Sequence, residues 1–334
     1  HIRGGRIDES MFVVDGFSVK DPLSGYSGNL FVNADAIEEL EIVTGGYNPE
    51  YGQAMSGVVN IKLKEGKDRY EGAIKFSSDR LFSENFNTDR FEFNLGGPDL
   101  FFQSLPKTFG IDLPGNFSFF LNGYGKVYDG NLPVADNLYP HRYWTSPFIS
   151  NENIDSFLKK LASRENNDWH MLYKMTWSLS PQKKFFISYD ASMNINQGYY
   201  MPRAFSSTYF PYRYMNILDN YNTITRDTRL LNLNWTHTLS TRSFYEITLG
   251  QFNTMEHSSV QDLSWTEYKE RLDLEPINYN IDNTDQDGNI FITYGDEFYD
   301  TGFAPEWYDL SSQNTRLDVD WTLHTQSGHK LKTG

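Results

Sequence analysis

The oxygen-bearing side chains of residues 282–289 are the first candidates for ligand chemistry in this sequence. The segment reads Asp282-Asn-Thr-Asp-Gln-Asp-Gly-Asn289, and calcium loops use a similar alternation of oxygen ligands around a glycine. The bidentate glutamate of a calcium loop is missing, because Tyr294 stands at the twelfth position counted from Asn283. The segment lies in an acidic stretch, residues 262–309, that holds thirteen acidic and two basic residues. We therefore predict a hydrated acidic loop, with no cofactor and no metal ligand. Calcium binding by residues 282–289 is the alternative.

Catalytic groups do not form a recognisable pattern. The seven histidines are scattered, and neither a serine nucleophile elbow nor a His-Glu-x-x-His zinc motif is present. The chain contains no cysteine, which excludes disulfides and thiolate metal sites within it. The sequence therefore predicts a protein that is not an enzyme.

Two segments combine Tyr, Trp and Arg in the manner of recognition surfaces, residues 139–148 and 199–215. Rigid aromatic faces bury a large area with little loss of entropy. On this basis the candidate ligand-binding residues are Tyr143, Trp144, Tyr199, Tyr200 and Arg203. The alternative is that these rings form an interfacial girdle at a membrane surface or pack loop against loop.

Charge and hydropathy restrict the class of protein. The net charge is −15, which argues against nonspecific binding to nucleic acid. No apolar run approaches the ~18 residues that a membrane-spanning helix needs. The chain begins at His1 and stops at Gly334 inside an apparent strand, so we expect a piece of a longer protein.

Apolar and polar residues alternate with period two along most of the chain, which is a strong strand signal. Eight such strands and the start of a ninth are predicted, several of them ~10 residues long, the length of a tilted membrane crossing. They cover residues 70–77, 91–95, 117–128, 171–179, 185–196, 230–239, 243–255, 316–324 and the segment from Lys330.

The connections between these strands alternate in length. Residues 180–183, 240–242 and 326–329 are short turns, whereas 131–167, 198–225 and 257–312 are long and irregular. Short turns on one side and long extracellular loops on the other are typical of outer-membrane barrels. Residues 96–115 are an exception, a longer connection on the turn side.

The first 64 residues have a different character. Residues 12–19 read as a hairpin turning at Asp15-Gly16, and residues 33–40 as a short helix capped by Asn33 or Asp35. Residues 41–44 and 57–63 read as strands of a small mixed sheet, joined by a glycine-rich connector.

Several short motifs in this region occur together. They are Ile2-Arg-Gly-Gly5, Val14-Asp-Gly16, Ile37-Glu38, Glu41-Ile-Val43, Tyr51-Gly52 and Gly57-Val-Val-Asn-Ile61. Together they resemble the end of the plug domain in TonB-dependent outer-membrane receptors. The resemblance covers residues 2–64 by motif and the rest of the chain by architecture.

This resemblance implies an all-β dominated protein, a transmembrane antiparallel β-barrel with a small mixed α/β plug. Residues 1–66 would be the carboxy-terminal part of the plug, and residues 67–334 the first strands of the barrel. An eight-stranded barrel is filled by its own side chains, so we expect these strands to belong to a larger barrel of about 22 strands, within the range known for plugged transporters.

The resemblance also implies a function and a location. The protein would take up an extracellular ligand across the outer membrane of a Gram-negative bacterium, driven by a TonB-type periplasmic partner and embedded in outer-membrane lipid. A non-transporting adhesin or assembly scaffold on the same barrel is the alternative. The plug residues implicated in structure and gating are Arg3, Gly4, Gly5, Asp15, Gly16, Glu38, Glu41, Gly45, Gly46, Tyr51, Gly52 and Gly57.

The sequence departs from the family pattern in one respect that concerns the plug. Many such receptors carry cations near the segments equivalent to residues 38–40 and 44–46, which lock the plug to carboxylates on the barrel wall. This chain has Glu38, Glu39 and Thr44 there, so Arg3 and Arg6 become the candidate locking cations. Glu38, Glu39 and Glu41 then either contact the barrel lumen or form a solvated face.

Overall fold

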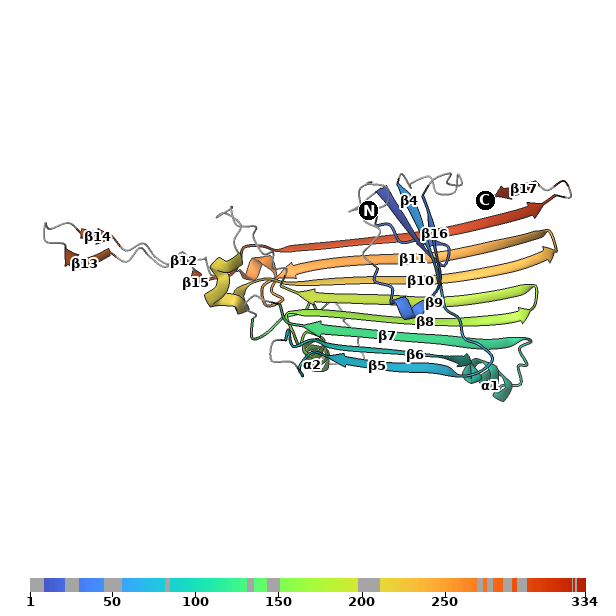
Figure 1. The fold of residues 1–334 in the computed structure, drawn as a ribbon, viewed down its shortest axis with the longest axis horizontal. Helices are drawn as coiled ribbons and strands as arrows, with labels where there is room; N and C mark the ends of the chain where they lie inside the picture. Colours follow the sequence, from blue (N-terminus) through green and yellow to red (C-terminus); the bar gives the residue numbers. More distant parts are fainter. Residues whose placement is uncertain are drawn as a thin grey trace.

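The protein consists of a large antiparallel sheet and a smaller mixed sheet, as shown by a computed structural model (Figure 1). The structure describes residues 9–21, 30–44, 56–81, 85–130, 135–142, 151–197, 211–268, 273–274, 279–284, 290–292, 299–325, 327 and 329–334. Among these residues, no helix has the length and apolar character needed to cross a membrane.

The large sheet contains nine strands in chain order, each antiparallel to the next. They are β5 (Glu71–Ser78), β6 (Asp89–Pro98), β7 (Asn116–Tyr128), β8 (Asn166–Ser180), β9 (Lys183–Asn196), β10 (Thr223–Ser240), β11 (Ser243–Ser259), β16 (Tyr308–His324) and β17 (Lys330–Thr333). The nine strands predicted from period-two alternation are confirmed. The strands at the centre are longer than predicted and extend into the segments expected to be loops.

The two ends of the large sheet differ (Figure 1). At the turn end, two residues join β8 to β9 and two join β10 to β11, as predicted. At the loop end, the connections are longer and partly regular, which corrects the expectation that they are irregular. They include α2 (Asn151–Leu161), 3-10 helices at Pro211–Asn220 and Trp265–Glu267, and the short strands β12 (Asp273–Leu274), β13 (Tyr279–Thr284), β14 (Ile290–Ile292) and β15 (Tyr299–Thr301).

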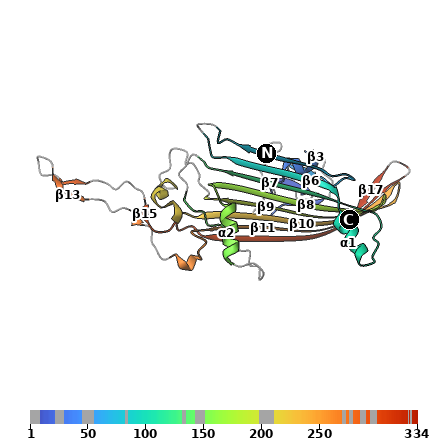
Figure 2. The ribbon, with the colours of Figure 1, turned by 90° about the horizontal axis from the view of Figure 1, so that it is seen from below.

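The longer connection on the turn side forms a helix, α1 (Leu100–Thr108). Asp99 caps it, because its carboxylate accepts hydrogen bonds from the N–H groups of Phe101 and Phe102, each at 3.1 Å. This is the usual capping arrangement for the free N–H groups of a first helical turn. Figure 2 shows α1 at the turn end and α2 near the loop end.

One face of the large sheet is apolar and open. Its exposed side chains include Ile74, Phe76, Phe91, Leu95, Met171, Leu249, Leu317, Val319 and Trp321. The opposite face is polar and carries buried groups such as Lys174, Asn232 and Thr248. Since a water-soluble sandwich packs its apolar faces together, this distribution is the one that a sheet in hydrocarbon requires.

The small sheet has four strands in the order β2-β1-β4-β3. Its strands are β1 (Ser10–Val14), β2 (Phe17–Ser18), β3 (Ile37–Val43) and β4 (Gly57–Leu63). β1 and β4 are parallel, and the other two pairs are antiparallel. The predicted hairpin and mixed sheet are confirmed.

The short helix predicted over residues 33–40 is wrong for most of its length. Only Ala34–Ala36 form a 3-10 turn, with Asn33 as the cap, whose side chain accepts from the Asp35 N–H at 3.2 Å. Residues 37–43 pair along β4 instead. A ladder with a neighbouring strand satisfies backbone groups along the whole segment, whereas a helix this short is marginal in water.

Candidate functional site

The small sheet packs against the polar face of the large sheet, and the two share one apolar cluster. Val14, Phe17, Val59 and Leu63 of the small sheet lie in the same cluster as Phe120, Leu172, Leu230 and Phe252 of the large sheet. The two sheets approach closely at Gly250 of β11, where an added Cβ would lie 2.2 Å from Cδ2 of Phe17. Gly250 therefore makes room for the Phe17 ring.

The hairpin turn of the small sheet places a carboxylate at this junction. Asp15 and Gly16 both have positive φ, 45° and 85°. A type I′ turn, a common two-residue hairpin turn, requires positive φ at both of these positions. The Asp15 carboxylate accepts a hydrogen bond from the Leu63 N–H at 3.0 Å and one from the Lys174 ammonium at 2.9 Å. Asn232 of β10 donates to the Asp15 carbonyl at 3.1 Å. Two strands of the large sheet thus hold the tip of the hairpin.

Lys174 has a second carboxylate partner in the segment that joins the two sheets. Its ammonium lies 3.3 Å from Glu65, and Glu65 also binds Lys184 of β9 at 2.6 Å. The side chains of Lys174 and Asp15 are 1% and 3% exposed, whereas Glu65 is 25% exposed. The Asp15–Lys174 ion pair is therefore fully buried, and Glu65 is a partly exposed second partner of the same ammonium.

The two carboxyls respond differently to this shared ammonium. Burial raises the pKa of the Asp15 carboxyl above its ordinary value, and Lys174 and the Leu63 N–H oppose the rise only in part. Burial acts on Glu65 in the same sense, but Lys174 and Lys184 outweigh it and hold the pKa of Glu65 below its ordinary value. The difference follows from the deeper burial of Asp15.

A second charged contact lies at the edge of the large sheet. Lys75 of β5 binds the Asp35 carboxylate at 2.5 Å and lies 3.7 Å from Glu92 of β6. The Lys75 hydrogen bond lowers the pKa of the Asp35 carboxyl. In both contacts the carboxylate belongs to the amino-terminal segment and the cation to the large sheet. The predicted locking cations, Arg3 and Arg6, lie outside the described residues, so the prediction about them stays a prediction.

Two further contacts connect the sheets nearer the loop end. Ser312 of β16 donates to the Asp21 carboxylate at 2.8 Å. The ring of Phe31 lies 4.8 Å from that of Tyr124 and 5.6 Å from that of His170. The contacts between the sheets therefore reach from β5 to β16.

A cavity of about 1100 Å³ lies between the two sheets. The small sheet contributes Asp15, Gly16 and Lys62 to its lining, and the large sheet contributes charged groups of β11, β16 and β17. These include Glu246, Arg316, Asp318, Asp320, Lys330 and Lys332. Polar groups of both signs thus line the space beside the locked hairpin.

Some of the residues predicted from sequence are placed by the structure. Asp15 and Gly16 lie at the centre of the junction, and Gly57 begins β4 opposite Ser10. Glu38 and Glu41 are exposed on β3. The remaining plug candidates, Arg3, Gly4, Gly5, Arg6, Gly45, Gly46, Tyr51 and Gly52, lie outside the described residues.

The candidate ligand residues also fall largely outside the described part of the chain. This holds for Tyr143, Trp144, Tyr199, Tyr200 and Arg203. Of the calcium pattern, the backbone of residues 282–284 belongs to β13, and residues 285–289 are outside. The ligand and calcium predictions stay predictions.

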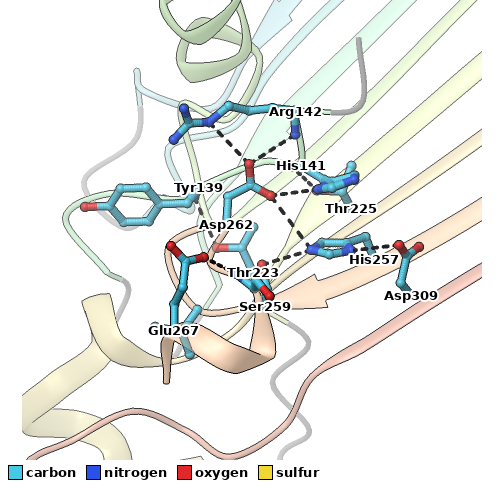
Figure 3. Close-up of polar contacts among 12 residues, drawn as sticks. Tyr139, His141, Arg142, Thr223, Thr225, His257, Ser259, Asp262, Glu267 and Asp309 are labelled. Carbon is cyan, nitrogen blue, oxygen red and sulfur yellow. Dashed lines mark hydrogen bonds and ion pairs between the residues drawn. The ribbon is translucent and has the colours of Figure 1, made fainter. Parts of the chain in front are cut away.

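The loop end carries a polar cluster that the sequence did not reveal (Figure 3). His141 Nδ1 lies 2.7 Å from one oxygen of Asp262, and His257 Nε2 lies 3.8 Å from the same oxygen. The two imidazole rings stack with centroids 3.7 Å apart. His257 and Asp262 lie close together in the sequence, whereas His141 is 121 residues from Asp262. His141 joins them because its segment is bound to β10, which pairs with β11.

Comparison with known proteins identifies the amino-terminal domain. A family model described as the TonB-dependent receptor plug domain matches residues 1–59. The TonB-dependent transporter Oar of Myxococcus xanthus is 33% identical over 73 residues, which are 22% of this chain and 7% of that protein. The amino-terminal residues 1–59 therefore match the plug domain of TonB-dependent receptors.

Solved structures support the same fold for the whole chain. The outer-membrane transporter YddB of Escherichia coli matches 95% of this chain and 38% of its own, with 10% identity and a TM-score of 0.52. The FrpB iron transporter of Neisseria meningitidis matches 97% of this chain and 40% of its own, with 9% identity and a TM-score of 0.51. The chain spans less than half the length of these proteins. The small sheet is accordingly the plug, and the large sheet is the wall.

The charged residues of the wall, Lys75, Lys174 and Lys184, were missed by sequence reasoning. Lys75 and Lys174 are single lysines on the polar faces of strands, and Lys184 follows Lys183 at a turn. In a sequence all three look like ordinary solvated positions. The one available signal was Lys174, which alternates with Tyr173 and Met175 in a strand otherwise poor in charge.

Proposed function

We propose that this chain forms the plug end and first wall strands of an outer-membrane importer. An extracellular ligand binds the long loops and the plug apex, and a TonB-type periplasmic protein then displaces the plug so that the ligand passes. The main observation in support is that hydrogen bonds and ion pairs hold the plug domain against the polar face of the large sheet. The family match and the named transporter relatives support the same proposal.

The chemistry of the plug–wall junction suits a domain that must move. If the junction were apolar throughout, releasing the plug would cost about 25 cal/mol for each Å² of apolar surface exposed to water. A buried ion pair such as Asp15–Lys174 is close to neutral in net stability, because desolvation offsets the attraction. Such pairs define one seated position for the plug and add little to the free energy of release.

Closure of the wall belongs to the same proposal. A sheet edge with unpaired backbone groups is not tolerated in hydrocarbon, and β5 and β17 are the edge strands here. We infer that further strands of the full-length protein pair with them, to about 22 in all, a number known for plugged outer-membrane transporters. The apolar outer face would then contact lipid of a Gram-negative outer membrane.

The loops supply the proposed ligand site. Tyr143, Trp144, Tyr199, Tyr200 and Arg203 are the residues that we expect to contact ligand, because their side chains combine aromatic surface with charge. Calcium at residues 282–289 is a further hypothesis for the acidic loop. We propose no catalytic role and no nucleic-acid partner; the relatives named above are transporters.

A disulfide between plug and wall tests the importer hypothesis. The chain has no cysteine of its own, so Asp21→Cys with Ser312→Cys would introduce a single bridge between plug and β16. The matched control is Ser10→Cys with Ser56→Cys, whose hydroxyls lie 3.0 Å apart within the plug. Cells producing each full-length variant are grown under oxidising and reducing conditions, and solutes remaining in the medium are measured by mass spectrometry.

The importer hypothesis predicts a set of solutes that only producing, energised cells deplete. The plug–wall bridge abolishes this depletion, reduction restores it, and the bridge within the plug leaves it unchanged. If gene deletion changes attachment to surfaces but no solute in the medium, the adhesin or scaffold alternative is correct and the importer hypothesis fails.

A further inference from the structure

The cluster at the loop end has the composition of a metal site. His141, His257 and Asp262 each offer one ligand atom, and these atoms lie within 4.8 Å of one another. The nearest pair, His141 Nδ1 and Asp262 Oδ1, are 2.7 Å apart. In a tetrahedral zinc site with bonds of about 2.0–2.1 Å the ligand atoms are about 3.3 Å apart. The two stacked rings must turn relative to each other so that both ligand nitrogens point to one ion.

The backbone holds each of the three residues in place. The His141 N–H donates to Thr225 of β10 at 3.1 Å, which fixes the segment 135–142 to the end of that strand. His257 lies in β11 and is 4% exposed. Gln261 and Asp262 both have φ of 54°, and this left-handed turn brings the carboxylate beside the ring nitrogens of the two histidines (Figure 3). A non-glycine residue in this conformation costs about 1 kcal/mol or more.

The neighbours of the three residues are those that orient metal ligands. The second oxygen of Asp262 accepts from the Arg142 N–H at 3.2 Å and lies 3.3 Å from Arg142 Nε, which leaves the first oxygen toward the imidazoles. On His257, Nε2 lies 3.0 Å from the Ser259 hydroxyl, which a bound ion would displace, and 3.8 Å from Asp262. Its Nδ1 lies 3.9 Å from Asp309. A histidine that binds a metal through one nitrogen usually donates its other N–H to a carboxylate.

One ring nitrogen of His257 has no hydrogen bond within the part of the chain that the structure describes. Its Nδ1 is buried and has no hydrogen-bond partner among the described residues. A buried polar atom without a partner costs about 1–3 kcal/mol. A metal on Nε2 would favour the tautomer that carries the proton on Nδ1, and the ring could then donate to Asp309.

We propose that His141, His257 and Asp262 bind a divalent transition-metal ion of the zinc class. Two imidazoles and one carboxylate suit Zn²⁺, Co²⁺, Ni²⁺ or Fe²⁺, whereas Ca²⁺ and Mg²⁺ prefer oxygen ligands throughout. Three protein ligands leave a fourth position open, as in exchangeable rather than purely structural zinc sites. The ion fastens the segment 135–142 to the end of β11, whether or not the protein is an importer.

Zinc binding to the full-length protein in detergent tests the proposal. The protein, without an affinity tag, is stripped with a chelator and titrated with Zn²⁺ against a chromophoric competitor. We expect roughly one ion per chain at this site, and at least about a tenfold loss of affinity in His257→Gln and in Asp262→Asn. The control is His237→Gln, which changes a histidine at the turn end of β10 and should bind zinc as the parent does.

A second experiment looks for a new zinc ligand, so that a loss of zinc binding through misfolding cannot be mistaken for support. In His141→Cys, X-ray absorption should show one zinc–sulfur distance of about 2.3 Å in place of a zinc–nitrogen distance. Equal zinc affinity in the parent, Asp262→Asn and His257→Gln overturns the proposal. A zinc-loaded His141→Cys protein without a sulfur neighbour also overturns it.

Discussion

Lys174 is the residue on which the seating of the plug depends most. Its side chain is 1% exposed, and its ammonium binds the carboxylates of Asp15 and Glu65 and the Leu63 carbonyl. Lys174→Met leaves the Asp15 carboxylate buried beside an apolar side chain, and removal of one partner of a buried pair costs about 3–5 kcal/mol. We expect the plug of this variant to unfold at a correspondingly lower guanidinium concentration, as measured by protease protection in detergent.

Two companion variants make this prediction specific. The double variant Asp15→Asn/Lys174→Met removes both charges and should recover most of the loss, because no unpaired ion remains buried. Lys67→Met removes an exposed pair with Glu71 and should change stability by less than about 1 kcal/mol. Equal losses in Lys174→Met and the double variant would show that packing, not charge, seats the plug.

The carboxyls of the junction also predict a dependence on pH. The pKa of Asp35 and that of Glu65 are lowered from ordinary values of 3.8 and 4.5. Their stabilisation is therefore complete above those values and is lost as the pH falls toward the lowered pKa. Asp15 has a raised pKa, so its contribution has the opposite sign and declines as the pH rises through that pKa.

We therefore expect plug protection to decrease below about pH 4.5. Hydrogen exchange of plug amides across pH 3–6, corrected for intrinsic exchange, measures this. Asp35→Asn with Glu65→Gln should flatten the profile, whereas Asp15→Asn should steepen it by removing the opposing contribution. A profile unchanged in both variants contradicts the assignment.

At the scale of elements, the strands were predictable and their ends were not. Alternation of apolar and polar residues predicts β10 over residues 230–239, yet the strand begins at Thr223. Residues 223–229 contain Thr, Arg and Asp, so the apolar signal is missing there while the hydrogen-bonded ladder with β9 and β11 continues. Pairing with the neighbouring strands therefore determines where β10 begins, and the sequence of one strand contains no information about that pairing.

Gly250 shows how one wall strand accommodates the plug. Gly250→Ala places a methyl group 2.2 Å from Cδ2 of Phe17, and overpacking of this kind typically costs about 1–3 kcal/mol. We expect earlier unfolding of the plug with an unchanged wall, since the strand itself tolerates alanine. Phe17→Leu should rescue Gly250→Ala by making room; failure of the rescue would place the defect in the strand.

At the scale of the molecule, the sequence predicts the fold but not the contacts between its parts. Asp15-Gly16 was recognised as a turn from its residue types, because only a few residues adopt positive φ at two positions. Its partner Lys174 is 159 residues away, and no local pattern connects them. The loop-end cluster was invisible for a similar reason, because His141 is 121 residues from Asp262.

The outer face of the wall provides the last prediction. Val319 of β16 is 53% exposed on the apolar face, whereas its neighbour Asp320 lines the cavity on the opposite face. If hydrocarbon covers the apolar face, Val319→Arg costs about 2–4 kcal/mol near the middle of the bilayer, and Asp320→Arg costs much less because water reaches it. Folding of the two full-length variants into lipid vesicles, followed by heat-modifiable mobility, compares them. Equal folding yields would mean that the apolar face meets protein instead of lipid, since only a face in contact with lipid distinguishes the two substitutions.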